Sequence, residues 1–383
     1  MTEPQRKMLR LLSSVLHGEV SEEKLSAADK TEILSLACRY GILYLLYDAV
    51  CTGEDPHQPT LKTFVRHSAV RSAAQSFALE QICAEAERTG TNVLLLKGAS
   101  IRSYYPQPEK REMWDIDLFA ASEQLEKTSA LLRSLGYKAG EICMHHRKWR
   151  HPQTGVCVEL HHTLGDEADY LKPFFTQVFE RAVPVDGFTY VYQMREADLY
   201  VHTVYHLRHH LQNGNWQFRQ LADIFLLETA TKRNAAEPAL HELGLMPFAE
   251  SLSAVTAQLF AGIEPTDANH RRLTECFLEN EKITFSPCAP SEKTKSMGKG
   301  ILRGLFPNPN IVYLTFPKIH RHKWLLPIGY LLRPLALFFY GRSHIKEKWN
   351  TLGKTAAASR MKSDEAFLNA VGINIRISKN YYY

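Results

Sequence analysis

The spacing of apolar residues changes twice along this chain, near residue 90 and near residue 195. Up to residue 88 they recur every three or four positions, which is typical of amphipathic helices. Between about 90 and 195 they form short continuous or alternating runs, which predict strands, and from residue 196 the helical spacing returns. We therefore expect an α+β fold in which helical regions flank a small mixed sheet.

These changes divide the chain into four predicted regions. With 383 residues, 45% of them hydrophobic, the chain is long enough for two or three domains with cores. The stretch 286–300 is polar with Pro and Gly and predicts a linker. The regions are an N-terminal helical region (1–89), an α/β core (90–195), a helical domain (196–290) and a basic C-terminal region packed on the body (291–383).

The predicted sheet is built from short runs in the middle region. NVLLLKG (92–98) predicts a buried strand that ends in a glycine turn, and MWDIDLFA (113–120) predicts an alternating strand. HHRKWRHPQTGVCVELHHTL (145–164) predicts a hairpin with its turn at Pro152 to Gly155, and FTYVYQM (188–194) one more strand.

Three carboxylates fall on these predicted strands. Asp115 and Asp117 are two positions apart, so their side chains project from the same face. Neighbouring like charges repel, and a divalent cation is the usual compensation. Glu159 interrupts an apolar strand, where a lone carboxylate is costly unless it is paired or bound to metal. Together they could hold two Mg²⁺ ions (Mn²⁺ is the alternative) about 3.5–4 Å apart, for an in-line phosphoryl or nucleotidyl displacement.

The turn after the first predicted strand suits the same chemistry. Gly98 permits close approach of the backbone to a phosphate, and the amides of a following helix can cradle an anion. Lys97 and Arg111 are candidates to neutralise triphosphate charge, and Ser100 is a further candidate contact. Alone, a DxD pair is more often a solvated face, and the ordered combination of turn, DxD and Glu is what points to nucleotide chemistry.

The string LLLKGASIRSYYPQPEKREMWDIDLF resembles the glycine turn and DxD strand of the DNA-polymerase-beta-like nucleotidyltransferase superfamily. It resembles more closely a bacterial family described as uncharacterised nucleotidyltransferases. VELHHTL, WQFRQLADIFLL and LLPIGYLLRP resemble later segments of that family, so the resemblance extends over most of the chain from about residue 90.

The resemblance implies roles for particular residues. Asp115 and Asp117 would be metal ligands, Glu159 the third carboxylate and Gly98 a neighbour of the nucleotide phosphates. The superfamily turn is usually Gly-Gly or Gly-Ser, whereas here Gly98 precedes Ala, with Ser100 one place later. The gap between Gly98 and Asp115 is also longer than in the minimal superfamily pattern.

The implied reaction transfers a nucleoside monophosphate from an NTP to an acceptor hydroxyl, with Glu159 as a candidate to help deprotonate the acceptor. The acceptor is unknown, and surface polysaccharide assembly is one context that fits. Two alternatives stay open. One is a non-catalytic nucleotide-binding or scaffold protein, and the other is a toxin-like nucleotidyltransferase acting on RNA.

Four further polar side chains are candidates to line the cleft: His161, His206, Arg219 and Asp223. His161 would share the face of Glu159 and lie near the metals. His202 and His206 share one helix face but lack the glutamate of an HExxH zinc site, which favours a cleft-lining or purely structural role. Arg219 and Asp223, one turn apart, predict either an ion pair within the helix or a contact that places the helix against the sheet.

Charge is distributed unevenly along the chain. From residue 291 onward there are 16 basic and 4 acidic residues, a net of +12, against −7 for the preceding part. LLPIGYLLRPLALFFY (325–340), with basic flanks, predicts a buried helix; contact with an anionic membrane surface is the alternative, and RNA binding has no accompanying motif. Seven scattered cysteines and the lack of a signal peptide or long apolar run predict a cytoplasmic protein, in the alternative peripheral at the inner membrane face.

Overall fold

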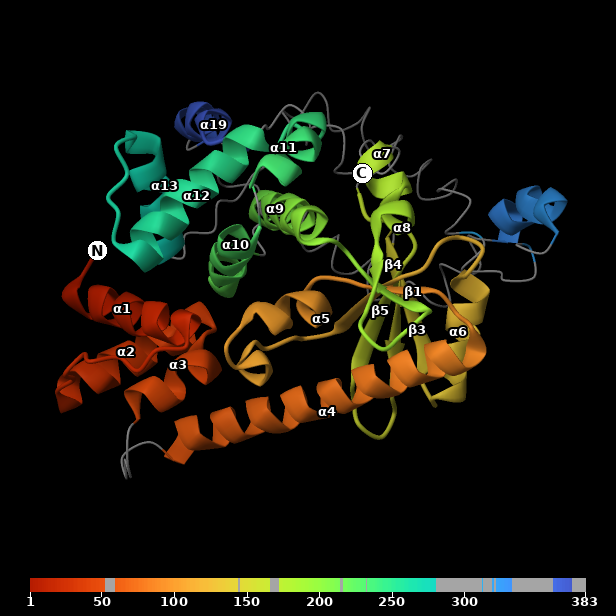
Figure 1. The fold of residues 1–383 in the computed structure, drawn as a ribbon, viewed down its shortest axis with the longest axis horizontal. Coiled ribbons are helices and arrows are strands. Elements are labelled where there is room, and N and C mark those ends of the chain that lie inside the picture. Colours follow the sequence, from red (N-terminus) through yellow and green to blue (C-terminus); the bar gives the residue numbers. More distant parts are fainter. Residues whose placement is uncertain are drawn as a thin grey trace.

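A computed structural model describes residues 1–51, 59–143, 145–165, 172–213, 216–231, 233–279, 322–332 and 361–373, together with Val312 and Ile319 (Figure 1). The described residues form helices around a seven-stranded mixed sheet of order β3-β4-β5-β2-β1-β7-β6, which confirms the predicted α+β fold. The strands are β1 (Val93–Leu95), β2 (Ile116–Phe119), β3 (Lys138–Ile142), β4 (His146–Arg150), β5 (Cys157–His161), β6 (Val183–Pro184) and β7 (Val191–Gln193).

The helices precede, interrupt and follow the strands along the chain. They are α1 (Glu3–His17), α2 (Ala27–Tyr40), α3 (Leu43–Val50), α4 (Pro59–Thr89), α5 (Gly98–Ile101), α6 (Leu125–Ser134), α7 (Pro173–Thr176), α8 (Val178–Arg181), α9 (Glu196–Asn213), α10 (Arg219–Ala230), α11 (Arg233–Glu242), α12 (Met246–Ala261), α13 (Ala268–Glu279) and α19 (Met361–Ala370). Capping boxes begin α1 and α2, and glycines with positive φ at positions 18 and 41 end them.

The centre of the sheet places the two acidic strands side by side. β2 pairs with β5 in parallel and with β1 in antiparallel orientation. β4 and β5 form the predicted hairpin, with Arg150 opposite Cys157 at its closed end. The sequence pattern missed β3, because KAGEI at the edge of the sheet is largely exposed and has no apolar alternation.

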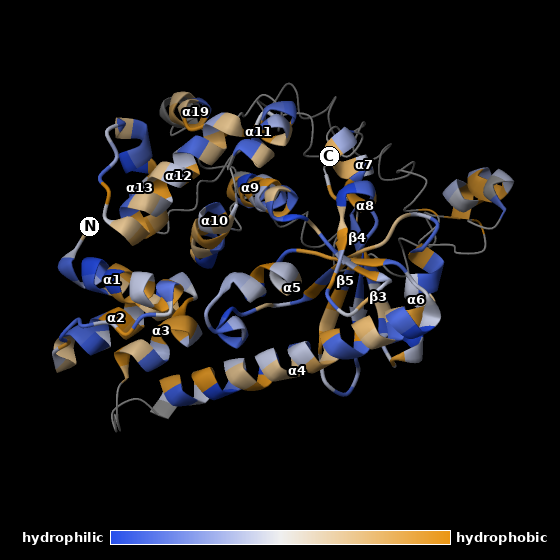
Figure 2. Ribbon diagram, in the orientation of Figure 1, coloured by the Kyte–Doolittle hydropathy of each residue, from blue (hydrophilic) through white to orange (hydrophobic). Residues whose placement is uncertain are grey.

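One face of the sheet is apolar and covered by helices. Ile116 and Leu118 of β2, Val158 and Leu160 of β5 and Trp149 of β4 are fully buried there, in one core with residues of α4 and α6. Figure 2 shows the strands at the centre of the sheet largely orange, while the ribbon of α4 alternates between orange and blue. Because strand side chains alternate, the residues between these apolar positions point to the opposite face.

The helices before and after the sheet share one core. Apolar side chains from α1, α2 and α3 are buried together with those of α9, α10, α12 and α13, and Figure 1 shows α1 beside α12. Ser13 Oγ donates to the carbonyl of Phe260 at 2.7 Å, and Tyr40 donates to the carbonyl of Leu278. The helical regions before and after the sheet therefore pack on one another. The domain boundaries at 89, 195 and 290 stay predictions.

The two described parts of the basic C-terminal region differ in burial: α19 is packed on the helical core, whereas residues 322–332 are largely exposed. In α19, Phe367 and Leu368 are buried in the helical core. In residues 322–332, Trp324 is 76% exposed and Leu331 77% exposed, rather than buried as in a helix packed on the body. The linker predicted at 286–300 and most of the segment 325–340 lie outside the described residues. Within the described ranges, no helix is both long and apolar enough to cross a bilayer.

Candidate active site

Asp117 lies at the centre of the polar face of the sheet. Its Oδ1 accepts from Lys97 Nζ at 2.9 Å and contacts His161 Nε2 at 2.8 Å, and the residue is 6% exposed. Burial alone would raise the pKa of Asp117, but the Lys97 ammonium and the hydrogen bond from His161 hold that pKa well below its usual range. Asp117 is thus a buried carboxylate that stays ionised.

Glu159 lies on the same face as Asp117. The parallel register of β2 and β5 places the two residues directly opposite one another. Glu159 Oε1 is 3.3 Å from His146 Nε2 and 3.4 Å from Lys148 Nζ, and its Oε2 is 3.8 Å from His161 Nε2. The structure therefore brings together two of the three predicted carboxylates on adjacent strands.

Asp115 directly precedes β2 and lies within the electrostatic influence of Asp117 and Glu159. It is half-buried, and among the described residues its carboxylate has no hydrogen bond or ion pair. Burial, followed by the negative charges of Asp117 and Glu159, raises the pKa of Asp115 to about 7. The charges of Asp117 and Glu159 thus reach Asp115, but among the described residues these three carboxylates do not form a group of ligand atoms within 4.8 Å of one another. Carboxylate oxygens are the donors that a hard divalent cation such as Mg²⁺ prefers.

The turn between β1 and α5 has a different basis from the one expected. Lys97, and not Gly98, has a positive φ, of 45°. Glycine is needed at 98 for space, because a Cβ there would lie 2.6 Å from Arg111 Nη1 and 2.9 Å from Met113 Cγ and Sδ. The close approach at Gly98 is thus made by side chains of the protein. α5 is a single turn of four residues.

Two predicted phosphate contacts are engaged inside the protein. Ser100 Oγ is buried and donates to the carbonyl of Leu95 at 3.1 Å. Arg111 forms a two-pronged ion pair with Asp223, with Nε–Oδ1 at 3.1 Å and Nη2–Oδ2 at 2.6 Å. Tyr105 donates to the same Oδ1 at 2.8 Å. In this structure Ser100 and Arg111 hold the turn and the approach to β2 in place.

The predicted ion pair between Arg219 and Asp223 within one helix is not formed. Asp223 pairs with Arg111 instead, and Arg219 donates to the carbonyl of Glu112. Both contacts tie α10 to the segment that leads into β2, which is the alternative expected for these residues. Arg111 and Asp223 are 112 positions apart, so no local pattern could pair them.

A row of histidines on α9 lies near the polar face. His202 and His206 stack with ring centroids 6.3 Å apart, and His206 Nε2 is 3.0 Å from His210 Nε2. Burial first, and then the positive charge of Lys97, lowers the pKa of His202 to about 3. Burial also lowers the pKa of His206 well below its usual value and that of His210 to about 4, so these rings are neutral at pH 7.

The described histidines and acids that group as potential metal ligands are on the sheet. His146, Glu159 and His161 each offer an atom within 4.8 Å of the others. His161 was expected near the carboxylates, whereas His146 was not. The sequence did contain the information needed to find His146. Counting back along the hairpin from its turn at 152–155 puts residue 146 opposite residue 161, on the same face as Glu159.

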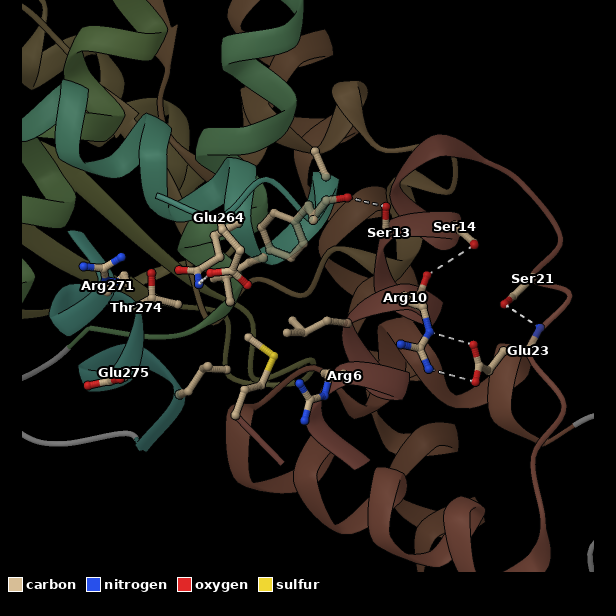
Figure 3. Close-up of a pocket in the computed structure, with 18 of the residues that line it drawn as sticks. Arg6, Arg10, Ser13, Ser14, Ser21, Glu23, Glu264, Arg271, Thr274 and Glu275 are labelled. Atoms are coloured by element: carbon tan, nitrogen blue, oxygen red, sulfur yellow. Dashed lines mark hydrogen bonds and ion pairs between the residues drawn. The ribbon is translucent and has the colours of Figure 1, made fainter. Parts of the chain in front are cut away.

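A separate cavity of about 910 Å³ lies between α1, α12 and α13 (Figure 3). None of the predicted site residues lines it. The charged groups in its wall include Arg10 and Glu23, which pair with each other at 2.8 Å. The carboxylates of the sheet, and not this cavity, are therefore the candidate reaction centre.

Comparisons with known proteins agree with this location. A family model described as an uncharacterised nucleotidyltransferase matches residues 26–261, a range that includes every candidate residue named above. It begins upstream of residue 90, where the resemblance was expected to start, and ends before the segment 325–334. Neither the curated proteins nor the solved structures contain a match to the chain. Because the match extends over more than half of its length, the chain belongs to the uncharacterised nucleotidyltransferase family.

Proposed function

We propose that the protein transfers a nucleoside monophosphate from an NTP to an acceptor hydroxyl and releases pyrophosphate. Membership of the family supports nucleotidyl transfer in general. The observation that carries the proposal is the parallel register of Asp117 and Glu159, with Asp115 beside them. The sheet also supports a place in the polymerase-beta-like superfamily, because the DxD strand lies between the strand before the glycine turn and the strand bearing the glutamate.

Asp115, Asp117 and Glu159 would hold the divalent ions, Mg²⁺ or Mn²⁺. When bound, such ions would neutralise the phosphates and stabilise charge on the attacking and leaving oxygens. Lys97 keeps Asp117 ionised and adds a positive charge near the phosphates. Among the three carboxylates, Asp115 has a pKa near 7, whereas the pKa of Glu159 is lowered, chiefly by His146 against the effect of burial. A bound cation would lower the pKa of Asp115, so we assign Asp115 to metal binding and not to proton transfer.

Calorimetric titration with Mg²⁺ and each NTP tests the site. We expect the Asp115→Asn and Asp117→Asn variants to lose Mg²⁺-dependent NTP binding, while the exposed Asp186→Asn variant binds like the native protein. Circular dichroism checks that each variant is folded. Equal NTP binding by the native protein and the double Asp115→Asn/Asp117→Asn variant would refute the assignment.

A non-catalytic nucleotide-binding protein is the second candidate. The observation in its favour is that Lys97 and His161 both contact Asp117 Oδ1. A metal ion bound to that oxygen would have to compete with these two contacts. An assay with NTP labelled at the α-phosphate and cell extract as the acceptor source separates the two, because a scaffold binds NTP without transferring label.

The proposals about the acceptor are supported only by the charge of the C-terminal region. Roles in polysaccharide assembly, at RNA or at the inner membrane face depend on the basic C-terminal region. Transfer of label to RNA that is lost on removal of residues 291–383 would favour the RNA proposal, and transfer to a saccharide fraction would favour the polysaccharide.

A further inference from the structure

We propose that His146, Glu159 and His161 form a binding site for a divalent transition-metal ion of the class Co²⁺ or Zn²⁺. The site shares Glu159 with the carboxylate group described above. Its ligands are otherwise two imidazole nitrogens, and it requires no nucleotide.

The pleat of the hairpin sets the three ligands on one face. His146 of β4 is directly opposite His161 of β5 in the antiparallel register. Glu159 is two positions before His161 on the same strand, so its side chain projects beside that of His161. The imidazole rings of His146 and His161 have centroids 5.0 Å apart. A sheet face holds such side chains more rigidly than a loop would.

The separations between the ligand atoms suit one shared ion. His146 Nε2 is 3.3 Å from Glu159 Oε1, and His161 Nε2 is 3.8 Å from Glu159 Oε2. Two ligands each about 2.1 Å from a tetrahedral ion lie roughly 3.4 Å apart. These two separations are close to this value, and one ligand atom of each residue lies within 4.8 Å of the other two, so small side-chain shifts bring all three onto one ion.

His146 supplies an independent observation. Its Nε2 is buried and lies 3.3 Å from Glu159 Oε1, where the two groups form an ion pair. A distance of 3.3 Å exceeds the usual 2.9–3.0 Å of an N–H···O bond. Metal binding requires a neutral imidazole, so an ion here would take the place of the proton that His146 shares with Glu159. A shared cation would bond both His146 and Glu159.

The ligand set selects among cations. Imidazole suits Zn²⁺, and Co²⁺ lies above Mn²⁺ in affinity for such nitrogen ligands, whereas Mg²⁺ and Mn²⁺ prefer oxygen ligands. Two positive side chains stand nearby, and neither blocks the site. Lys148 is 43% exposed, so it can turn into solvent, and Lys97 is paired with Asp117. His161 Nε2 is also 2.8 Å from Asp117 Oδ1, which places a further oxygen at the edge of the site.

The test uses full-length protein without a polyhistidine tag, stripped with chelator and titrated with metal alone. We expect one equivalent of Co²⁺ to bind with visible d–d absorption, Zn²⁺ to displace it, and a thousandfold excess of Mg²⁺ to leave the spectrum unchanged. The His146→Gln and His161→Gln variants should each bind Co²⁺ at least tenfold more weakly. His67→Gln, at an exposed position on α4, is the matched control and should bind like the native protein.

Several outcomes would overturn the proposal: no visible absorption with Co²⁺, displacement of Co²⁺ by Mg²⁺, or an unchanged Co²⁺ affinity in the folded His146→Gln variant. The first two need only native protein, so a variant that fails to fold does not end the test. Asp115→Asn separates this site from the proposed nucleotide site, because it should abolish NTP binding and keep the Co²⁺ spectrum.

Discussion

The ion pair between Arg111 and Asp223 is the contact whose removal should cost the most stability near the candidate site. Its side chains are 7% and 2% exposed, and two hydrogen bonds join them. Replacing Asp223 by Ala leaves the Arg111 guanidinium buried without its partner. Breaking a buried pair from one side typically costs about 3–5 kcal/mol.

Two neighbours reinforce this magnitude. Tyr105 donates its hydroxyl to Asp223 and would lose that acceptor. Burial, and then the charge of Arg111, lowers the pKa of Arg219 to about 10, so the two guanidinium groups already repel one another. Without Asp223 that repulsion loses its largest offset. We therefore expect the Asp223→Ala variant to lose about 4 kcal/mol of unfolding free energy.

Urea unfolding followed by circular dichroism measures this loss. The double variant Arg111→Leu/Asp223→Leu removes both charges, so it should be more stable than Asp223→Ala. If Asp223→Ala cost less than about 1 kcal/mol, the typical size of an exposed pair, the contact would not be the buried clamp described here. A double-variant loss equal to the sum of the single losses would also refute the reasoning.

Three further predictions concern other positions. Gly98→Ala should lower the unfolding free energy by about 1–3 kcal/mol in urea titrations, because its Cβ overlaps the buried side chains that touch the turn; an unchanged midpoint would count against it. Gly372→Ala (φ 77°) puts a Cβ 2.3 Å from the backbone nitrogen of Phe248, so its Tm should fall well below that of Gly155→Ala (φ 71°), which meets nothing and carries only the backbone cost of about 1–2 kcal/mol. Because the pKa of His202 is lowered to about 3 in the folded state, the stability that neutral His202 contributes is complete above pH 6.5 and is lost as the pH falls toward 3. In urea titrations at each pH, the His202→Gln variant should therefore lose about 1 kcal/mol less unfolding free energy between pH 7.5 and 5.5 than the native protein does. An equal loss in both proteins would contradict this.

Local patterns were sufficient for the elements that carry the carboxylates. The alternation in WDIDLF placed Asp117 and its apolar neighbours on opposite faces, and the hairpin turn at 152–155 set the strand of Glu159. The pairing of these strands was not local. It was inferred from the chemistry of the three carboxylates, since spacing alone cannot say which strands become neighbours.

Long-range partners were beyond sequence patterns. Lys97 and Arg111 were both expected at phosphates because a positive charge near a glycine turn is typical of such sites. Only the fold shows that each has a carboxylate partner, Asp117 for one and Asp223 for the other. Both pairs form because these groups are buried, and a buried charge requires a partner.

The backbone conformation of Lys97 affects the charge of Asp117 on the polar face of the sheet. A non-glycine residue at φ 45° and ψ −118° carries strain of about 1–3 kcal/mol. Glycine at this position would remove the strain, but it would also remove the only ammonium group within 3 Å of Asp117 among the described residues. Without that ammonium, the effect of burial, which raises the pKa of Asp117, would be opposed chiefly by His161 alone. The strained turn thus keeps Asp117 ionised although it is buried, which is the state that a metal ligand requires.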